Sequence, residues 1–278
     1  LKEEKMKKIV ILTAVLFFTL SPNSFGEVVS RIMSYNGPGS QIDKCNAIAQ
    51  DLSGKVYATG VSWGGNTTKD DFATMKFSED GDFLWVQRFD GPGHNLDYAA
   101  AITVDNAGNV YVTGWVRTGA DYGSEDYCTI KYNTNGVQQW VRLYDGAVTS
   151  ECYYYDYAKA IWVDAQGNVY VTGTSWGNDN LNGDYLTLKY NSAGTLQWAK
   201  RYNGPSSKED IANSIALDAS GNVYITGGST TTNKGFDMLT IKYNTRGTQQ
   251  WATRYDGPGL GDDFANEVRV DQNGNVYI

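Results

Sequence analysis

The chain has 278 residues, of which 31 are acidic and 23 basic, and its formal net charge is −8. Binding to the phosphates of nucleic acids needs clustered Lys and Arg, so this charge balance argues against a nucleic-acid-binding protein. The single histidine, His94, makes a multi-histidine metal site or a Ser-His-Asp triad hard to build.

Residues 1–26 have the pattern of a secretory signal peptide. Met6–Lys8 is a short basic start, residues 9–20 are apolar, and small residues precede the expected cleavage site. The apolar stretch is too short to cross a bilayer, which needs about 20 residues. We expect residues 1–5 to precede the natural start. The mature protein is then expected to begin near residue 27, to be secreted or held at the cell surface, and to have no transmembrane span.

A phrase related to GNVYVTG recurs along the rest of the chain. Its copies begin at Gly54, Gly108, Gly167, Gly221 and Gly274. Successive copies are 54, 59, 54 and 53 residues apart. Three other phrases accompany it: an opening Asp followed by small residues, a phrase such as DYCTIKY, and a closing phrase such as GVQQWVRLYDG. All four are rich in β-branched and aromatic residues and are separated by Gly, Asn and Asp, which is typical of strands joined by turns.

Four short strands in each repeated unit predict a blade of a β-propeller. The expected blades are at about residues 40–93, 94–146, 147–204 and 205–258. Residues 27–39 match a fourth strand alone, and residues 259–278 match only the first two strands of a further blade. We therefore expect residues 27–278 to form an all-β propeller that is truncated at its C-terminal end.

Differences in length between the units are confined to two connections. The opening Asp and the Gly of GNVY are 11 residues apart in every unit, whereas the connection after GNVYVTG and the connection between blades vary. We expect the second strand to end at the Thr-Gly of this phrase and the variable connection to begin there. Both variable connections leave a four-stranded meander at the same end, here named the loop face. Binding residues usually lie on such adjustable loops.

The order of the phrases, as in DYAAAITVDNAGNVYVTG followed by DYCTIKYNTNGVQQWVRLYDG, resembles the SBBP bacterial β-propeller repeat. The resemblance extends over residues 29–278. It implies a propeller from a large secreted or cell-surface bacterial protein, and some such proteins are described as S-layer-like. It supplies no catalytic motif that could be transferred to residues of this chain.

Each closing phrase contains one tryptophan, four residues after a glycine. These residues are Trp85, Trp140, Trp198 and Trp251. A tryptophan at the same outer-strand position of every blade is most simply explained by packing against the neighbouring blade. We predict a structural role for this ring rather than contact with a ligand.

Two rings of aspartates are expected at the loop face. One opens the first strand of each unit, and the other opens the third strand. In one interpretation they bind calcium, which takes six to eight oxygen ligands, through Asp97, Asp126, Asp156 and Asp184. In the other they cap backbone N–H groups of the turn between blades. Repetition in every blade favours capping, so we predict no cofactor and keep calcium as the alternative.

Aromatic residues near the loop face are the candidates for ligand binding. Trp63, Trp115 and Trp176 are expected just after second strands, and an insertion in one unit contains Tyr153, Tyr154 and Tyr155, with Tyr157 nearby. Such side chains stack on sugar rings or anchor protein partners. In the alternative interpretation, the tryptophans fold over the blade edges as lids.

These patterns predict a secreted or cell-surface interaction scaffold that binds a protein or a glycan and has no enzymatic activity. No nucleophile, base and orienting group can be assembled from named residues. Two alternatives stay open. One is a hydrolase, a lyase or a quinoprotein-like enzyme on the propeller scaffold, and the other is a structural surface-layer or spacer module.

Overall fold

The fold is known from a computed structural model. The structure describes residues 33–39, 41–119, 124–146, 154–177, 180–231, 235–259 and 261–278. The expected signal peptide lies outside these ranges. All secondary-structure elements in the described ranges are β-strands, and this part of the chain has no helix long and apolar enough to cross a membrane.

Four consecutive groups of four antiparallel strands form the predicted blades. Blade 1 consists of β1 (Asp43–Gln50), β2 (Val56–Gly65), β3 (Lys69–Phe77) and β4 (Phe83–Phe89). Blade 2 consists of β5 (Asp97–Val104), β6 (Val110–Arg117), β7 (Ser124–Tyr132) and β8 (Gln138–Tyr144). Blade 3 consists of β9 (Tyr154–Val163), β10 (Val169–Gly177), β11 (Asn180–Tyr190) and β12 (Leu196–Tyr202). Blade 4 consists of β13 (Asp210–Leu217), β14 (Val223–Thr230), β15 (Phe236–Tyr243) and β16 (Gln249–Tyr255). The all-β propeller prediction is confirmed.

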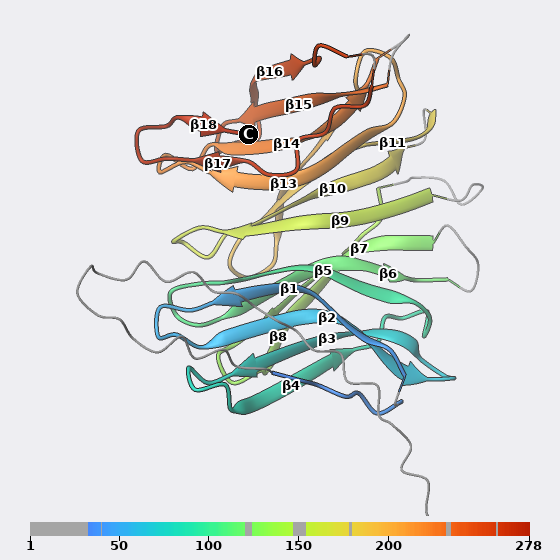
Figure 1. Cartoon of the computed structure of the whole chain (residues 1–278), viewed down its shortest axis with the longest axis vertical. Helices are drawn as coiled ribbons and strands as arrows, with labels where there is room; N and C mark the ends of the chain where they lie inside the picture. The colour runs from blue at the N-terminus through green and yellow to red at the C-terminus, as the bar shows by residue number, and fades with distance from the viewer. Residues whose placement is uncertain are drawn as a thin grey trace, which may run out of the picture.

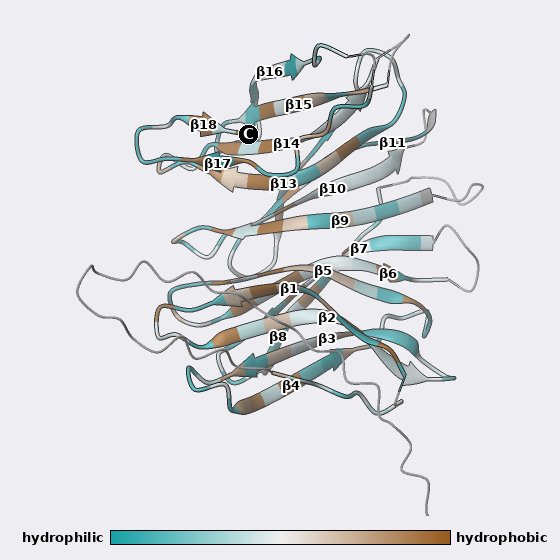
Figure 2. Ribbon diagram, in the orientation of Figure 1, coloured by the Kyte–Doolittle hydropathy of each residue, from teal (hydrophilic) through white to brown (hydrophobic). Residues whose placement is uncertain are grey.

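The blades follow one another in an arc, from β1–β4 at the bottom of Figure 1 to β13–β16 at the top. The first strands of successive blades, β1, β5, β9 and β13, contact one another along this arc. After blade 4 the chain forms the short pair β17 (Arg269–Val270) and β18 (Val276–Tyr277). Figure 2 shows that hydrophobic and hydrophilic residues are mixed along the strands, whereas the turns are mainly hydrophilic.

The hydrophobic core lies between neighbouring blades. One cluster joins Tyr57 and Phe72 of blade 1 to Val112 and Ile130 of blade 2, all fully buried. Similar clusters join blade 2 to blade 3 and blade 3 to blade 4. Because each blade buries one face against the previous blade and the other against the next, both faces of its middle strands are apolar.

Blades 2 and 3 are joined more closely than the repeat predicts. The start of β7 pairs in parallel with the start of β9, at Ser124 with Tyr154 and at Glu125 with Tyr155. The two blades therefore form one eight-stranded sheet instead of two separate four-stranded sheets. The pairing is possible because β9 begins two residues before the opening Asp156, whereas β5 and β13 begin at their opening aspartates.

The first hairpin of each blade is closed by an aspartate. In blade 2, Asp105 Oδ1 accepts hydrogen bonds from the backbone N–H groups of Ala107 and Asn109, both at 2.9 Å. Its Oδ2 accepts one from the hydroxyl of the buried Tyr111, also at 2.9 Å. Gly108 takes the positive φ (79°) that this turn requires. One side chain thus fixes the turn and the second strand together.

We expect Asp105→Ala to reduce the free energy of unfolding by about 2–3 kcal/mol, because it leaves the buried Tyr111 hydroxyl and two turn N–H groups without their acceptor. Urea unfolding measures this loss. Asp105→Asn keeps one acceptor oxygen and should cost less. An Asp105→Ala protein as stable as the unsubstituted chain would show that the turn does not depend on this side chain.

The Thr-Gly of GNVYVTG does not end the second strand. In blade 2 the strand continues three residues beyond Gly114, to Arg117. Gly114 faces a β-bulge in β5 between Ala99 and Ala101. A Cβ at Gly114 would lie 1.9 Å from the carbonyl oxygen of Tyr98, so a side chain has no room there. The expectation was wrong because the glycine is required by close backbone approach in mid-strand, not by a turn.

Trp140 shows how the repeated tryptophans are placed. Its ring lies 6.3 Å from that of Tyr111 in the same blade and 6.2 Å from that of Tyr190 in the next blade. Its Nε1 donates a hydrogen bond to the backbone oxygen of Ser192, also in the next blade, at 3.2 Å. The side chain therefore spans the interface between blades 2 and 3.

Candidate functional site

Five aromatic rings form a continuous line at the loop face of blades 2 and 3. We name this line the aromatic row; its members, in order, are Tyr98, Trp115, Tyr157, Tyr155 and Trp176. Successive ring centroids are 5.7, 5.5, 5.8 and 4.9 Å apart, and stacked pairs alternate with edge-to-face pairs. Each of the five residues keeps part of its surface accessible to solvent.

Strand register explains the row. Tyr98 on β5 is paired directly with Trp115 on β6, so the two rings stack on one face of blade 2. Tyr155 and Tyr157 are two residues apart on β9 and therefore point to the same face of blade 3. The edge-to-face contact of Trp115 with Tyr157 joins the two blades.

The structure brings together half of the predicted ligand-binding residues. Trp115, Tyr155 and Trp176 belong to the row, whereas Trp63 lies in blade 1, where the Lys69 ammonium is 6.0 Å from its ring centroid. Tyr153 and the side chain of Tyr154 are outside the described part of the chain. The three tryptophans lie within the second strands rather than after them, because these strands are longer than predicted.

Tyr98 was missed by sequence reasoning. It directly follows an opening Asp, at a position where only two of the five units have tyrosine, Tyr98 and Tyr157. This departure from the repeat is the feature of the sequence that could have marked Tyr98 as a candidate. Its hydroxyl accepts a hydrogen bond from Lys44 Nζ and donates one to Asn46 Oδ1, both at 3.2 Å, which holds this end of the row against blade 1.

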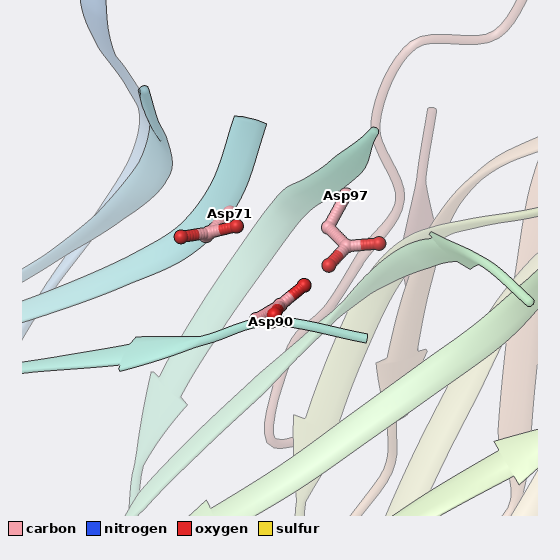
Figure 3. A group of neighbouring side chains, drawn as sticks. All are labelled: Asp71, Asp90 and Asp97. Carbon is pink, nitrogen blue, oxygen red and sulfur yellow. The ribbon is translucent and has the colours of Figure 1, made fainter. Parts of the chain in front are cut away.

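Acidic side chains gather at the blade junctions, also at the loop face. Each group combines the aspartate at the start of a third strand, the residue that follows the fourth strand, and the opening aspartate of the next blade. The groups are Asp71–Asp90–Asp97, Asp126–Asp145–Asp156 and Asp237–Asp256–Asp263. In each, one potential ligand atom per residue lies within 4.8 Å of the others. Figure 3 shows the first group, in which the three carboxylates point toward one another.

The opening aspartates accept hydrogen bonds from the turns between blades. Asp97 accepts from the N–H of Gly91 at 2.5 Å, and Asp156 accepts from the N–H of Gly146 at 2.6 Å. These are the contacts that the capping interpretation requires. The middle residues Asp90 and Asp145 were missed, because in the sequence they read as ordinary turn residues before glycine.

Burial dominates the electrostatics of these groups. The pKa of Asp97 is raised to about 7, chiefly by removal from water and in smaller part by the nearby Asp90 and Asp71 carboxylates, against the lowering effect of two backbone hydrogen bonds. In the second group, burial raises the pKa of Asp126 to about 6 and that of Asp156 to about 7. Asp184 lies within the third strand of blade 3 and is fully buried beside Arg201.

The four-stranded repeats and their arrangement around an arc define a β-propeller. The model of the SBBP β-propeller repeat matches residues 84–115, 153–181 and 197–234. The chain therefore carries SBBP β-propeller repeats, and the resemblance to this repeat is confirmed over these three segments. No curated protein matches the chain.

Solved structures match the fold at low identity. An exo-β-1,3-galactanase from Clostridium thermocellum is 12% identical, with a TM-score of 0.45, over 75% of this chain and 47% of that chain. An endo-arabinase from Bacteroides thetaiotaomicron is 12% identical, with a TM-score of 0.43, over 80% of this chain and 83% of that chain. An α-L-arabinofuranosidase from Clostridium thermocellum is 13% identical, with a TM-score of 0.44, over 84% of this chain and 80% of that chain.

The prediction that the chain has no enzymatic activity is contradicted by these matches. Glycoside hydrolases are among the solved structures that match the chain. Their identities of 10–13% and TM-scores below 0.5 do not assign a reaction or a catalytic residue to this chain.

Proposed function

We propose that this propeller binds an extended carbohydrate along the aromatic row of its loop face. The observation that carries the proposal is the continuity of the row: five partly exposed rings from two blades, in contact from Tyr98 to Trp176. Sugar rings have apolar C–H faces that pack on aromatic rings, and successive sugars of a chain need successive platforms.

The polar groups of the row suit the same ligand. The hydroxyls of three tyrosines offer hydrogen bonds beside the apolar ring surfaces, and Lys44 and Asn46 add polar groups at the Tyr98 end. A site that combines aromatic surface with a few fixed polar groups is typical of small-molecule and glycan recognition. The secretory pattern of residues 1–26 supports a place of action outside the cell or at its surface, where polymeric glycans occur.

Glycan-array binding of the purified protein tests the proposal. We expect Trp115→Ala and Trp176→Ala each to weaken binding by about fivefold, since loss of one aromatic contact is worth roughly 1 kcal/mol and 1.4 kcal/mol corresponds to a factor of ten. Trp63→Ala is the matched control, because Trp63 is a tryptophan on a second strand that lies outside the row.

The control should bind like the unsubstituted protein. Equal losses in all three variants would contradict a site along the row. The absence of any glycan ligand, together with capture of a protein from cell-wall extracts by the same face, would favour a protein partner instead.

A further inference from the structure

We propose that Arg117 and Glu125 are positioning residues for the aromatic row: their buried ion pair holds the part of the row in blade 2 against the part in blade 3. This role rests on the proposed function of the row as a carbohydrate site. The row passes from blade 2 to blade 3 through the contact between Trp115 and Tyr157, whose ring centroids are 5.5 Å apart. A ligand that extends over both blades needs these two rings in one fixed arrangement.

The ion pair lies deep in the structure. Arg117 donates hydrogen bonds from Nε and from a terminal guanidinium nitrogen to Glu125 Oε1, at 3.0 and 2.5 Å. Only 7% of the arginine side chain and 2% of the glutamate side chain are exposed, so neither offers a ligand a contact surface. Separation of such a pair would leave an uncompensated buried charge, which is costly. The two side chains therefore hold β6 and the start of β7 together.

Strand register places the ion pair at the point where the row passes between the blades. Arg117 is two residues after Trp115 on β6, so both side chains lie on the same face of blade 2. Glu125 is paired with Arg117 across β6 and β7, and with Tyr155 across β7 and β9. The arginine, the glutamate and the tyrosine thus follow one another on three neighbouring strands. The residue that accepts from Arg117 is the one whose main chain adjoins blade 3.

The ionisation of Tyr157 reflects both charges. Its pKa is raised to about 12, chiefly by burial and in smaller part by the Glu125 carboxylate and by Tyr155, while the Arg117 guanidinium lowers it. Both members of the ion pair therefore lie close to the ring that joins the two parts of the row.

The charged pair is a departure of blade 2 from the repeat. The same two paired positions of the second and third strands hold Trp63 and Asp70 in blade 1, Trp176 and Gly183 in blade 3, and Thr230 and Phe236 in blade 4. Blade 2 is also the blade whose third strand pairs with the first strand of the next blade. The ion pair and the joining of two blades into one sheet thus occur at the same residue, Glu125.

The other blades have an ion pair at a different place. An arginine of the fourth strand contacts an aspartate of the third strand and also donates to a serine of the second strand. The residues are Arg88, Asp71 and Ser62 in blade 1, Arg201, Asp184 and Ser175 in blade 3, and Arg254, Asp237 and Ser229 in blade 4. In blade 2, Leu143 stands at the position of the arginine and Val116 at that of the serine.

Positioning accounts for a charged pair at this place better than stability does. An apolar pair of similar volume would fill the same space, and such replacements are often as stable as a buried ion pair or more so. An apolar pair, however, lacks the fixed directions of two hydrogen bonds and tolerates small shifts of one strand against the other. The ion pair allows one arrangement of β6, β7 and β9, and the row then has one shape before the ligand arrives.

The first test needs no ligand. The mature protein is labelled with fluorotryptophan, and the fluorine NMR signal of Trp115 is assigned by its loss in Trp115→Phe. The double variant Arg117→Met/Glu125→Leu removes both charges, so its Tm should stay within about 5 °C of that of the unsubstituted protein. We expect its Trp115 signal to be shifted or broadened, because the ring no longer keeps one position beside Tyr157. Arg117→Lys, which keeps the charge and loses one of the two hydrogen bonds, should give a smaller change.

Arg254→Gln is the matched control. It removes the ion pair with Asp237 in blade 4, away from the row. We expect a lower Tm and an unchanged Trp115 signal. A Trp115 signal that is unchanged in the double variant and in Arg117→Lys, or one that changes equally in Arg254→Gln, would overturn the positioning role.

The second test compares long and short sugars by calorimetric titration. The probes are cellohexaose, xylohexaose and arabinohexaose, each with its disaccharide. If about one tenth of the double-variant molecules keep the competent arrangement, the affinity for a hexasaccharide that binds the unsubstituted protein falls about tenfold. A disaccharide, which needs only one part of the row, should lose less than about twofold. Equal losses for both lengths would overturn the role of the pair in joining the two parts. A changed Trp115 signal without binding of any probe to the unsubstituted protein would support the positioning role and count against the carbohydrate site.

Discussion

Gly114→Ala is expected to destabilise the propeller by at least about 3 kcal/mol, at the upper end of the cost of overpacking. An alanine Cβ at this position would lie 1.9 Å from the carbonyl oxygen of Tyr98 and 2.9 Å from the Cα of Ala99. Both atoms belong to the main chain of β5, so relief requires that the β5–β6 pairing open at its bulge. Urea unfolding followed by tryptophan fluorescence measures the loss.

The control is Gly261→Ala. Apart from its chain neighbours, no atom of the described residues lies within 4 Å of a Cβ at Gly261, so this change should leave the unfolding midpoint where it is. The glycines equivalent to Gly114 in the other blades meet a carbonyl oxygen at 1.9–2.0 Å and should respond in the same way. If the free energy of unfolding of the Gly114→Ala protein were within about 0.5 kcal/mol of that of the unsubstituted chain, the bulge would relax easily. The recurrence of glycine at this position would then need another explanation.

Trp140→Ala is expected to cost about 3–5 kcal/mol, the usual penalty for truncating a buried tryptophan. Only 7% of Trp140 is exposed, and the ring fills the space between Tyr111 and Tyr190 of adjacent blades. The substitution also removes the hydrogen bond from Nε1 to the Ser192 carbonyl. Because the cavity would form at a blade interface, both the midpoint and the cooperativity of unfolding should fall.

Trp251→Ala provides the matched comparison. Trp251 occupies the same repeat position in blade 4 but is 37% exposed, and it contacts Tyr224 of its own blade. We expect a smaller loss than for Trp140→Ala, since a larger part of the Trp251 side chain is already in contact with water. Equal losses for Trp140→Ala and Trp251→Ala would contradict the role of this ring in joining blades.

The blades could be predicted from the sequence because each of their parts is local. A turn such as Asp105–Gly108 and a strand of alternating β-branched and aromatic residues are encoded within a few residues of each other. Repetition then removes ambiguity, because the same phrase occurs in every blade. Fixed intervals between phrases located the hairpins, and variable intervals located the loop face.

The residues of the candidate sites could be predicted only in part, because they depend on contacts between blades. The parallel pairing of β7 with β9 has no local signal, and without it Tyr155 and Trp115 would not belong to one row. Asp90 reads as a turn residue until the next blade brings Asp97 beside it. The mid-strand role of Gly114 was missed because a bulge on the partner strand leaves no pattern in the glycine's own sequence.

The departures from the repeat are more informative about function than the repeat itself. Tyr98, Trp115 and Tyr155 break the pattern of the other blades and belong to the aromatic row. Val116 and Leu143 break it in blade 2, where they occupy the positions of the serine and the arginine of the other blades. The phrases that recur in every blade form the scaffold. The residues that depart from the repeat at the loop face lie in blades 2 and 3.

A crystal structure of the protein saturated with an oligosaccharide from the glycan array tests the central claim most directly. We expect sugar density along the aromatic row, with sugar rings against Trp115 and Trp176. Density confined to the face opposite the loop face, or to blade 1 around Trp63, would contradict carbohydrate binding along the row.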